Sequence, residues 1–265
     1  MAYDDLKSEL SESSLFNNSL AKGLAVVRAF SASKREMNLP EIAEIAGITK
    51  SAAQRFTFTL ETMGYLRKDS KTKRYSLSPK CLDLGFGYLR ANWLIDHANP
   101  FLLDLNRKCG ETVNMSEPDG NDMIFVARFP SHHDFAVHMP VGMRLPIFCT
   151  ASGRAYLSAL PSDEAKQVLS HCKPQRFTPS TITDLDVVAD LVEEARSKGF
   201  AWAKEEYYRG DIAIAAPVRN AQGKVLGAIN VSLPSSRWTL ESGVEKVAPL
   251  VLEIASSITT SPPSS

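Results

Sequence analysis

A glycine at position 47 separates two short segments in which apolar residues recur at helical spacing. Glycine adopts the left-handed backbone conformation of a tight turn without steric penalty, so Gly47 predicts a turn between two helices. Pro40 suits the first turn of the earlier helix, and Thr49 can cap the later one, at about 50–63. The residues expected to face inward are Ile42, Ile45 and Ala46 before the glycine, and Ala53, Phe56, Leu60 and Met63 after it.

Flanking segments complete a small domain around this turn. Capping residues at 17–19 predict a helix that starts near Leu20 and buries Leu20, Leu24, Val27 and Phe30. After Gly64, which ends the third helix, two short strands within 65–77 enclose a polar, basic tip and predict a hairpin. Three helices followed by a basic hairpin predict a winged helix-turn-helix over 17–78, centred on 39–66.

The distribution of charge separates this domain from the rest of the chain. The 265 residues carry no net charge, but residues 17–80 contain twelve basic and five acidic side chains, a net charge of +7. Residues 1–16 carry −3, which leaves −4 for the remainder. A basic domain joined to a mildly acidic one indicates a polyanionic partner for the first domain alone.

The helix at 50–63 has the composition of a helix that reads double-stranded DNA. Such a helix enters the major groove with its N-terminal residues foremost. Gln54 can bond adenine, Arg55 can bond guanine or phosphate, and Ala52 can contact a thymine methyl group. We expect Phe58 to pack against the hairpin or the linker, with DNA contact as the alternative. The residues expected to contact DNA are Ser19, Thr49, Lys50, Ser51, Ala52, Gln54 and Arg55, together with Lys68, Lys71, Lys73 and Arg74 on the hairpin.

The rest of the chain alternates between helix and strand patterns. Helical spacing over 79–109 predicts linker helices with a bend at Asn99 and Pro100. Residues 110–258 are expected to form an α+β domain, a mostly antiparallel sheet covered by helices. The expected strands are 111–117, 123–129, 135–139, 200–205, 212–219 and 225–233, and the expected helices are 151–160, 162–170, 184–198 and 239–258. We expect 1–16 to be a flexible arm and 259–265 a disordered tail.

The sequence argues against several classes of function. Its apolar runs are too short to span a membrane and its first residues lack an apolar signal region, so we expect a cytoplasmic protein without membrane contact. The four cysteines form no CxxC pair, and His132, His133 and His138 are expected at the surface, so we expect neither a metal nor a cofactor. Because no nucleophile elbow, HExxH, P-loop or GxGxxG motif occurs, we expect no enzyme.

Several segments, taken in order, resemble one family, the IclR-type transcription regulators. The resemblance covers about 18–258 and includes MNLPEIAEIAGITKSAAQRFTFTLETMGYLRKDSKTKRYSLSPK, GETVNMSEPDGNDMIFVARF, PVGMRLPIFCTASGRAYLSAL and KGFAWAKEEYYRGDIAIAAPVRNAQGKVLGAINVS. It implies a GAF-like effector-binding domain, and homodimers or homotetramers bound to palindromic operators. It also implies effectors that are small carboxylates or aromatic compounds from catabolic pathways, with either repression or activation of the target operon.

The resemblance further implies an effector pocket on one face of the second domain's sheet. A helix that begins at Ala151 would favour a carboxylate at its N-terminus. Ala213 stands where the isocitrate-lyase repressor type has a cysteine and Asn230 where it has a serine, and Tyr207 and Tyr208 add bulk, so we expect a larger or aromatic acid. The implied pocket residues are Arg144, Thr150, Ser152, Gly153, Glu206, Tyr207, Asp211, Ala213, Asn230 and Ser232.

Alternatives stay open for these residues and for the whole chain. Arg144 and Glu206 could form a structural ion pair, and Thr150 and Ser152 could act only as helix caps. The chain could also be a winged-helix protein-interaction module, or an architectural DNA-binding protein without an effector. A small polar helix face beside a basic hairpin argues against the first, and an α+β domain of about 150 residues argues against the second.

Overall fold

The computed structural model describes residues 13–31, 33–131, 133 and 139–260, which divide into two compact units between Leu89 and Arg90. The division falls inside 79–109, where linker helices were expected. His132, His138, most of the expected strand at 135–139, and the chain ends at 1–12 and 261–265 lie outside the described residues. Within the described part, no helix is long and apolar enough to cross a membrane.

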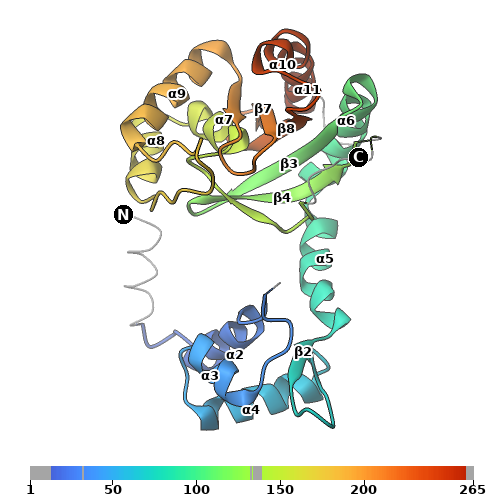
Figure 1. The fold of residues 1–265 in the computed structure, drawn as a ribbon, viewed down its shortest axis with the longest axis vertical. Helices are drawn as coiled ribbons and strands as arrows, with labels where there is room; N and C mark the ends of the chain where they lie inside the picture. The colour runs from blue at the N-terminus through green and yellow to red at the C-terminus, as the bar shows by residue number, and fades with distance from the viewer. Residues whose placement is uncertain (1–12, 32, 132, 134–138, 261–265) are drawn as a thin grey trace. The chain divides into compact units, whose positions relative to one another are not determined.

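The first unit is a winged helix-turn-helix, which confirms the prediction (Figure 1). Its capped helices are α2 (Asn18–Arg28), α3 (Leu39–Ile45) and α4 (Lys50–Thr62). Gly47 makes the turn between α3 and α4 with a φ of 64°, in the left-handed region. The hairpin pairs β1 (Leu66–Lys68) with β2 (Tyr75–Leu77).

Local hydrogen bonds explain why each helix begins where it does. Asn17, Asn38 and Thr49 each accept a backbone N–H from the first turn that follows. At α3 the side chain of Glu41 also accepts the backbone N–H of Asn38 at 2.7 Å, which completes a capping box. These signals lie within a few residues of each helix, so the sequence alone predicts these helix starts well.

The core of this unit differs from the predicted one at the ends of the helices. Its buried members are Val26, Ala29, Met37, Ile42, Ala43, Ala53, Leu66 and Tyr75. The prediction was wrong for Leu20 and Leu24, which are 63% and 46% exposed, and for Ile45 and Met63, which are also exposed. Helix α2 packs through Val26 instead, so its apolar stripe at Leu20 and Leu24 remains uncovered.

Two helices span the segment between the hairpin and the sheet. A short 3-10 turn, η1 (Pro79–Cys81), leads into α5 (Leu82–Ala91), and α6 (Trp93–Cys109) follows. The helical path is interrupted at Asn92, which caps α6, and α6 continues through Pro100. The sequence predicts a bend at Asn99 and Pro100 instead. The cap explains the difference, because Asn92 accepts the N–H of Leu94 at 3.0 Å and begins a new helix.

The second unit is built on a six-stranded sheet in the order β5-β4-β3-β8-β7-β6, with every neighbouring pair antiparallel. This is the α+β architecture that the sequence predicts. The strands are β3 (Thr112–Asp119), β4 (Asp122–Phe129), β5 (Arg144–Pro146), β6 (Ala201–Lys204), β7 (Asp211–Arg219) and β8 (Val225–Pro234).

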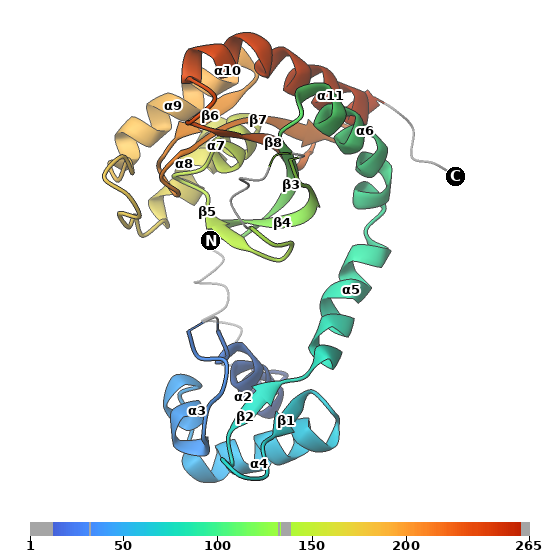
Figure 2. The same ribbon diagram turned by 45° about the vertical axis from the view of Figure 1, so that its right-hand side comes forward.

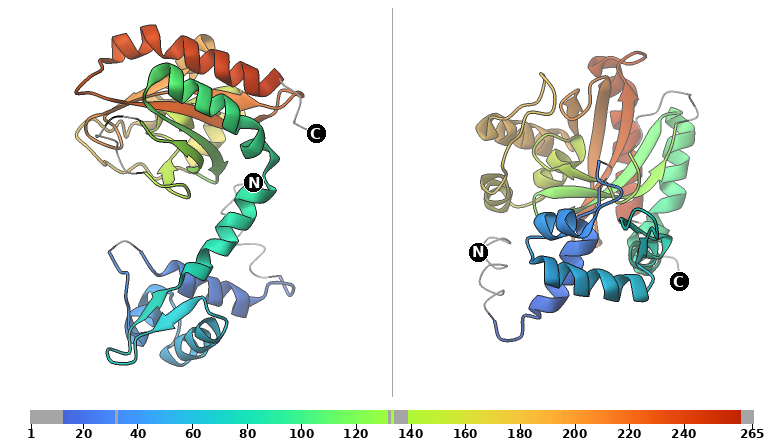
Figure 3. Two further views of the ribbon diagram at one scale, coloured as in Figure 1. Left: turned by 90° about the vertical axis from the view of Figure 1, so that its right-hand side faces the viewer. Right: turned by 60° about the horizontal axis from the view of Figure 1, so that its bottom comes forward.

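Helices cover both faces of this sheet (Figures 2 and 3). One face is covered by α6, α10 (Leu240–Lys246) and α11 (Ala248–Thr260), and the other by α7 (Ala151–Ala159), α8 (Ser162–Ser170) and α9 (Leu185–Lys198). The single helix expected over 239–258 is two helices that divide at Val247, which ends α10. The pocket described below lies on the face under α7.

Candidate DNA interface and effector pocket

Helix α4 presents a polar, exposed face at its N-terminal end. Lys50, Ser51, Gln54 and Arg55 are exposed, whereas Ala53 and Thr57 on the opposite side are buried in the unit's core. Thr49 is also exposed, and its hydroxyl accepts the N–H of Ala52 at 3.2 Å as the helix cap. Ala52 is half-buried, and Ser19 on α2 is exposed.

Phe58 lies on the exposed side of the same helix. Its side chain is 68% exposed, so the expectation that it packs against the hairpin or the linker was wrong for the chain by itself. It follows Gln54 by four positions and Arg55 by three, which places it next to both on the helix surface. Phe58 therefore extends the exposed face of α4 with an apolar group.

The hairpin presents two lysines at its tip, whereas Arg74 has a role in the hairpin's own structure. Lys71 and Lys73 are exposed at the tip. Asp69 accepts the backbone N–H groups of Lys71 and Thr72 at 2.9 and 2.6 Å, which lowers the pKa of this carboxyl and shapes the tip. Arg74 donates to Glu41 of α3 at 2.8 Å, so it secures the hairpin to α3.

Lys68 is the fourth hairpin cation predicted to contact DNA. Its ammonium lies 5.2 Å from the centre of the Tyr75 ring, within cation–π range, while the residue itself stays exposed. Because this contact holds the side chain along the hairpin, Lys68 is less available to a phosphate than Lys71 or Lys73.

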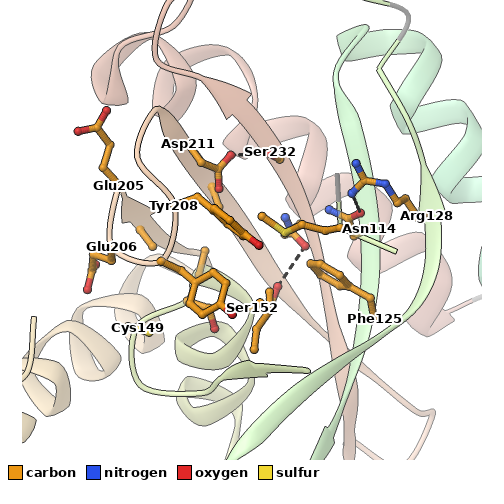
Figure 4. A pocket seen from close by; sticks show the side chains of 18 residues that line it. Asn114, Phe125, Arg128, Cys149, Ser152, Glu205, Glu206, Tyr208, Asp211 and Ser232 are labelled. Atoms are coloured by element: carbon orange, nitrogen blue, oxygen red, sulfur yellow. Dashed lines mark hydrogen bonds between the residues drawn. The ribbon is translucent and has the colours of Figure 1, made fainter. Parts of the chain in front are cut away.

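A pocket lies between α7, the sheet and the β6–β7 connection (Figure 4). Of the predicted pocket residues, Thr150, Ser152, Glu206, Tyr207, Asp211, Ala213, Asn230 and Ser232 line it, whereas Arg144 and Gly153 do not. Tyr208, whose bulk was expected here, also lines it, as do Ala151 and Glu205, which are next to predicted residues. The lining residues that sequence reasoning missed are Asn114, Phe125, Arg128, Met139, Leu145, Cys149 and Ala203.

Three polar side chains form a row across neighbouring strands in this pocket. Asn114 on β3 is in register with both Arg128 on β4 and Asn230 on β8. Arg128 Nη1 donates to Asn114 Oδ1 at 3.0 Å, and Ser152 Oγ on α7 donates to Asn230 Oδ1 at 3.2 Å. We call Arg128, Asn114 and Asn230 the polar row. It connects the sheet to the start of α7, as the dashed lines in Figure 4 show.

A bulge in β4 brings an aromatic side chain to the same face as the polar row. Ala127 pairs with Met115 and Phe125 pairs with Ser116, so the register passes over Val126. Without this extra residue, 125 and 128 would point to opposite faces of the sheet, because side chains alternate along a strand. The bulge therefore places Phe125 in the lining together with Arg128.

The opposite part of the pocket is apolar and aromatic. Phe125, Met139 and Leu145 form a buried cluster against which Tyr207 and Tyr208 pack. The two tyrosine rings lie 4.9 Å apart and nearly perpendicular, at 81°. We call these five residues the aromatic wall. Cys149 nearby is no candidate nucleophile, because burial raises the pKa of its thiol to about 12.

Glu206 lines the pocket by position, but its carboxylate is directed into a buried ion pair. Arg154 of α7 donates to its two oxygens at 2.6 and 2.7 Å, and both side chains are at most 2% exposed. Thr181 donates to the backbone carbonyl of Glu206 at 2.6 Å. These bonds anchor the β6–β7 connection, and with it the tyrosines of the aromatic wall.

Arg144, an expected carboxylate ligand and an alternative partner of Glu206, lies outside the pocket lining. It is half-exposed and pairs with Asp119 at 2.6 Å and with Asp122 at 3.0 Å. Glu206 therefore does form a structural ion pair, as one alternative from the sequence held, but its partner is Arg154 and not Arg144. Arg144 and Arg154 are ten positions apart, and only their placement in the fold distinguishes them.

The start of α7 is held close to the preceding strand. Thr150 Oγ1 donates to the carbonyl of Pro146 at 3.0 Å and accepts the N–H of Gly153 at 3.2 Å, so Thr150 is a cap that also lines the pocket. A Cβ at Gly153 would lie 2.0 Å from the carbonyl oxygen of Ile147. Gly153 thus permits the close approach that positions α7.

Asp211 is the acidic group inside the pocket. Its carboxylate accepts a hydrogen bond from Ser232, and Arg128 lies near enough to stabilise its charge. Burial outweighs both effects and raises the pKa of Asp211 to about 6. The arrangement suits binding of a polar molecule with an apolar body. Within the described residues, no cluster of histidine, cysteine and acidic side chains fits a metal ion.

Comparisons with known proteins agree with both units. Residues 19–70 match the family model of the IclR helix-turn-helix domain, and residues 86–260 match that of the bacterial transcriptional regulator IclR C-terminal domain. The Pca regulon regulatory protein of Pseudomonas putida is 33% identical over 238 residues, which are 89% of this chain and 81% of that protein.

Two solved structures resemble the fold. An IclR transcriptional regulator from Alicyclobacillus acidocaldarius has a TM-score of 0.80 and 27% identity, over 92% of this chain and 98% of that one. The inducer-binding domain of a PobR double mutant from Acinetobacter, in complex with 3-hydroxybenzoic acid, has a TM-score of 0.56 and 29% identity. It covers 61% of this chain and 94% of its own. This chain belongs to the IclR family of bacterial transcription regulators, which are DNA-binding proteins and not enzymes.

Proposed function

We propose that this protein binds a palindromic operator and controls a catabolic operon in response to a small organic or aromatic acid. The pocket carries the proposal, because a few polar side chains, the polar row, lie in it together with the aromatic wall, which is the composition of a small-molecule site. The Acinetobacter PobR domain, which has a related fold, is in complex with an aromatic acid. An architectural DNA-binding protein would have no use for such a pocket.

The DNA contacts are divided between α4 and the hairpin. Gln54 and Arg55 read base edges in the major groove, and Lys50 and Ser51 contact phosphates beside them. Lys71 and Lys73 contact phosphates on the flank. Phe58, exposed one turn beyond Gln54, joins this face, where an apolar group can contact the methyl of a thymine.

A second copy of the chain covers apolar side chains that the first unit leaves exposed. Leu20 and Leu24 lie one turn apart on α2, and Leu82 and Phe86 lie one turn apart on α5, with 46–72% of each side chain exposed. Monomeric proteins seldom expose so many neighbouring large apolar groups. A symmetric dimer would bury them and present two α4 helices to the two halves of a palindrome.

The decisive experiment maps the sites that the protein occupies across the genome of the bacterium that encodes it. Binding to the strongest site is then measured by fluorescence anisotropy. The expected result is a palindromic site beside an operon of catabolic genes, with an affinity that changes when an aromatic acid such as 4-hydroxybenzoate is added. Unchanged affinity over a panel of organic and aromatic acids would contradict the effector part of the proposal.

A further inference from the structure

The three acidic residues that line the pocket differ in where their carboxylates lie. Glu206 is paired with Arg154, and the carboxylate of Glu205 accepts the N–H of Gly210 at 3.0 Å. Figure 4 shows both of these carboxylates directed away from the cavity. The carboxylate of Asp211 stays at the pocket, so it is the acidic group that a ligand would meet.

Two neighbours stabilise the negative charge of Asp211 in part. Ser232 on β8 donates a hydrogen bond to its Oδ1, and the guanidinium of Arg128 on β4 attracts it. Even with both, burial raises the pKa of Asp211 to about 6. Arg128 is already bonded to Asn114 and is the one cation among the lining residues in the described part of the chain. It therefore cannot neutralise both Asp211 and an anionic ligand.

The polar row supplies hydrogen-bond donors to the same pocket. Arg128 donates to Oδ1 of Asn114 and Ser152 donates to Oδ1 of Asn230, so the acceptor oxygen of each amide is occupied. Both asparagines are at most 5% exposed, and their amide N–H groups find no hydrogen-bond partner among the described residues. Because buried donors without partners are costly, these amides are suited to an oxygen of a ligand.

We propose that Asp211 binds the acid group of the effector by sharing one proton with it, so that the protein takes up a proton when it binds the effector. This inference rests on the proposed function and adds the protonation state of its site. The proton comes from solvent and forms an O–H bond on one of the two carboxylates, and this O–H donates to the other. The bound pair then carries one negative charge instead of two.

The register of the sheet places the two acid groups side by side. Ser232 and Asn230 are two positions apart on β8, about 7 Å along the strand, and point to the same face. The hydroxyl of Ser232 holds the carboxylate of Asp211 from the neighbouring strand β7. An acid group that accepts from the amide of Asn230 would therefore lie beside Asp211.

The relative sizes of two costs favour the shared proton. Two ionised carboxylates about 4 Å apart repel each other enough to weaken binding about 1000-fold at the effective dielectric of protein sites. Protonating a carboxyl whose pKa is about 6 costs about tenfold in affinity at pH 7. Proton uptake is therefore the less costly way to bind an anion next to Asp211.

Wild-type protein tests the proton count without any substitution. We would titrate 4-hydroxybenzoate calorimetrically at pH 7.5 in phosphate and in Tris, whose different heats of ionisation report the protons exchanged. Pyruvate is the second probe, because the inference concerns the acid group alone. We expect uptake of about one proton per ligand, and an affinity that falls about tenfold per pH unit between pH 7 and pH 8.5. Absence of proton uptake with the acid that binds more tightly would overturn the inference.

Asp211→Asn distinguishes the shared proton from an ordinary hydrogen bond. The asparagine amide donates an N–H without a proton from solvent, so the variant should bind the acid without proton uptake and independently of pH. At pH 8 it should bind about 10- to 100-fold more tightly than wild type. An ionised Asp211 that accepts a ligand hydroxyl predicts the opposite, so weaker binding by Asp211→Asn at pH 8, or proton uptake that persists in it, would overturn the inference.

A matched control and two further readouts separate the possible failures. Asp119→Asn changes a half-exposed acid outside the lining and should keep the proton uptake of wild type. Operator binding without ligand and a thermal unfolding midpoint no lower than that of wild type show that each variant is folded. If Asp211→Asn fails this check, the proton count with wild-type protein still decides.

The outcomes also distinguish this inference from the proposed function. Acid binding without proton uptake overturns the shared proton alone. Wild-type protein that binds neither acid, and whose operator affinity never responds to organic acids, overturns the proposed function as well.

Discussion

At the scale of single residues, burial distinguishes three arginines of the second unit. Arg154 is buried and paired, Arg144 is at the surface in two ion pairs, and Arg128 is half-buried in the pocket. The three side chains have the same chemistry, so their different roles come from the surroundings that the fold supplies.

Glu206→Gln is expected to destabilise the protein strongly. The substitution leaves the charge of Arg154 buried without its partner, and breaking one member of such a pair lowers the unfolding free energy by about 3–5 kcal/mol. Urea titration, monitored by circular dichroism, measures the unfolding free energy. Asp119→Asn, which removes a partner of the half-exposed Arg144, is the control and should lower it by at most about 1 kcal/mol. Equal effects of the two substitutions would contradict this account.

Asp211 should make the unfolding free energy depend on pH, and Asp211→Asn should remove this dependence. The folded state raises the pKa of Asp211 from 3.8 to about 6, so between these values the native protein holds the proton more tightly than the unfolded chain. The stability contributed by this group is present below about pH 4 and lost as the pH rises to about 6. Relative to wild type, Asp211→Asn should therefore gain about 1–3 kcal/mol in unfolding free energy between pH 4 and pH 7. A difference that stays constant over this range would show that the carboxyl is not perturbed.

Phe58→Ala is expected to weaken operator binding, because it removes the proposed contact between the phenyl ring and a thymine methyl group. For wild type, replacing thymines by deoxyuridine one at a time in the operator should reveal a position where the missing methyl lowers affinity severalfold. In Phe58→Ala, which lacks the phenyl ring, replacing the same thymine by deoxyuridine should not lower the affinity further. Phe58 is 68% exposed, so the fold should tolerate the change. If the losses of binding free energy caused by Phe58→Ala and by the deoxyuridine replacement add at every thymine, Phe58 does not contact a methyl group.

At the scale of elements, we expect α4 and the hairpin to have different parts in DNA binding. The exposed residues of α4 include groups that can distinguish bases, whereas the hairpin offers lysines at its tip. Affinity for any DNA and preference for one operator should therefore respond to different substitutions.

Arg55→Ala and Lys71→Ala should separate these two parts. Arg55→Ala should weaken operator binding by about 1–3 kcal/mol with little effect on a scrambled sequence, if the guanidinium contacts a base. Lys71→Ala should weaken both DNAs alike and reduce the slope of log affinity against log salt by about one. Titrations at four salt concentrations measure both. Arg74→Ala is a useful comparison, since Arg74 is engaged with Glu41 and should leave the slope nearly unchanged. A changed base preference in Lys71→Ala would contradict this division.

At the scale of the whole molecule, apolar side chains left exposed on α2 and α5 point to a second copy of the chain. They belong to the unit that carries α4, so assembly and DNA recognition should depend on each other. The proposed palindromic operator gives the same expectation, because a palindrome contains two equivalent half-sites.

Phe86→Glu should shift the protein toward monomers and weaken operator binding. A charge at this position opposes burial of the apolar side chains around it, and a monomer contacts only one half-site. Light scattering coupled to size-exclusion chromatography measures the mass, and anisotropy measures binding to a full and a half operator. Glu245→Lys on α10 is a control for surface charge. A dimer of unchanged mass that still prefers the full operator would place the interface elsewhere.

The helix-turn-helix could be predicted from the sequence because its signals are local. Asn17, Asn38 and Thr49 cap helices within three residues of themselves, and Gly47 makes its turn alone. The buried set was less predictable. Leu20 and Leu24 have the spacing of a buried face, but the sequence contains no sign of whether the chain itself or a second copy covers them.

The pocket was predicted only where the resemblance to a family supplied positions. Alternation along β8 places Asn230 and Ser232 on one face, and both line the pocket as expected. Phe125 and Arg128 were missed, because a bulge in β4 alters the alternation and bulges have no reliable signal in a single sequence. Glu206 was assigned to the ligand because its ion pair with Arg154 spans 52 positions.

The amino-acid sequence by itself determined the winged helix-turn-helix, the family, and the contrast between a basic first unit and an acidic second one. These features follow from contacts within a few residues, from composition, or from motif order. Only the tertiary structure decided which arginine lines the candidate effector pocket. That choice depends on sheet register, on a bulge and on burial, all of which arise from pairings between residues far apart in the chain.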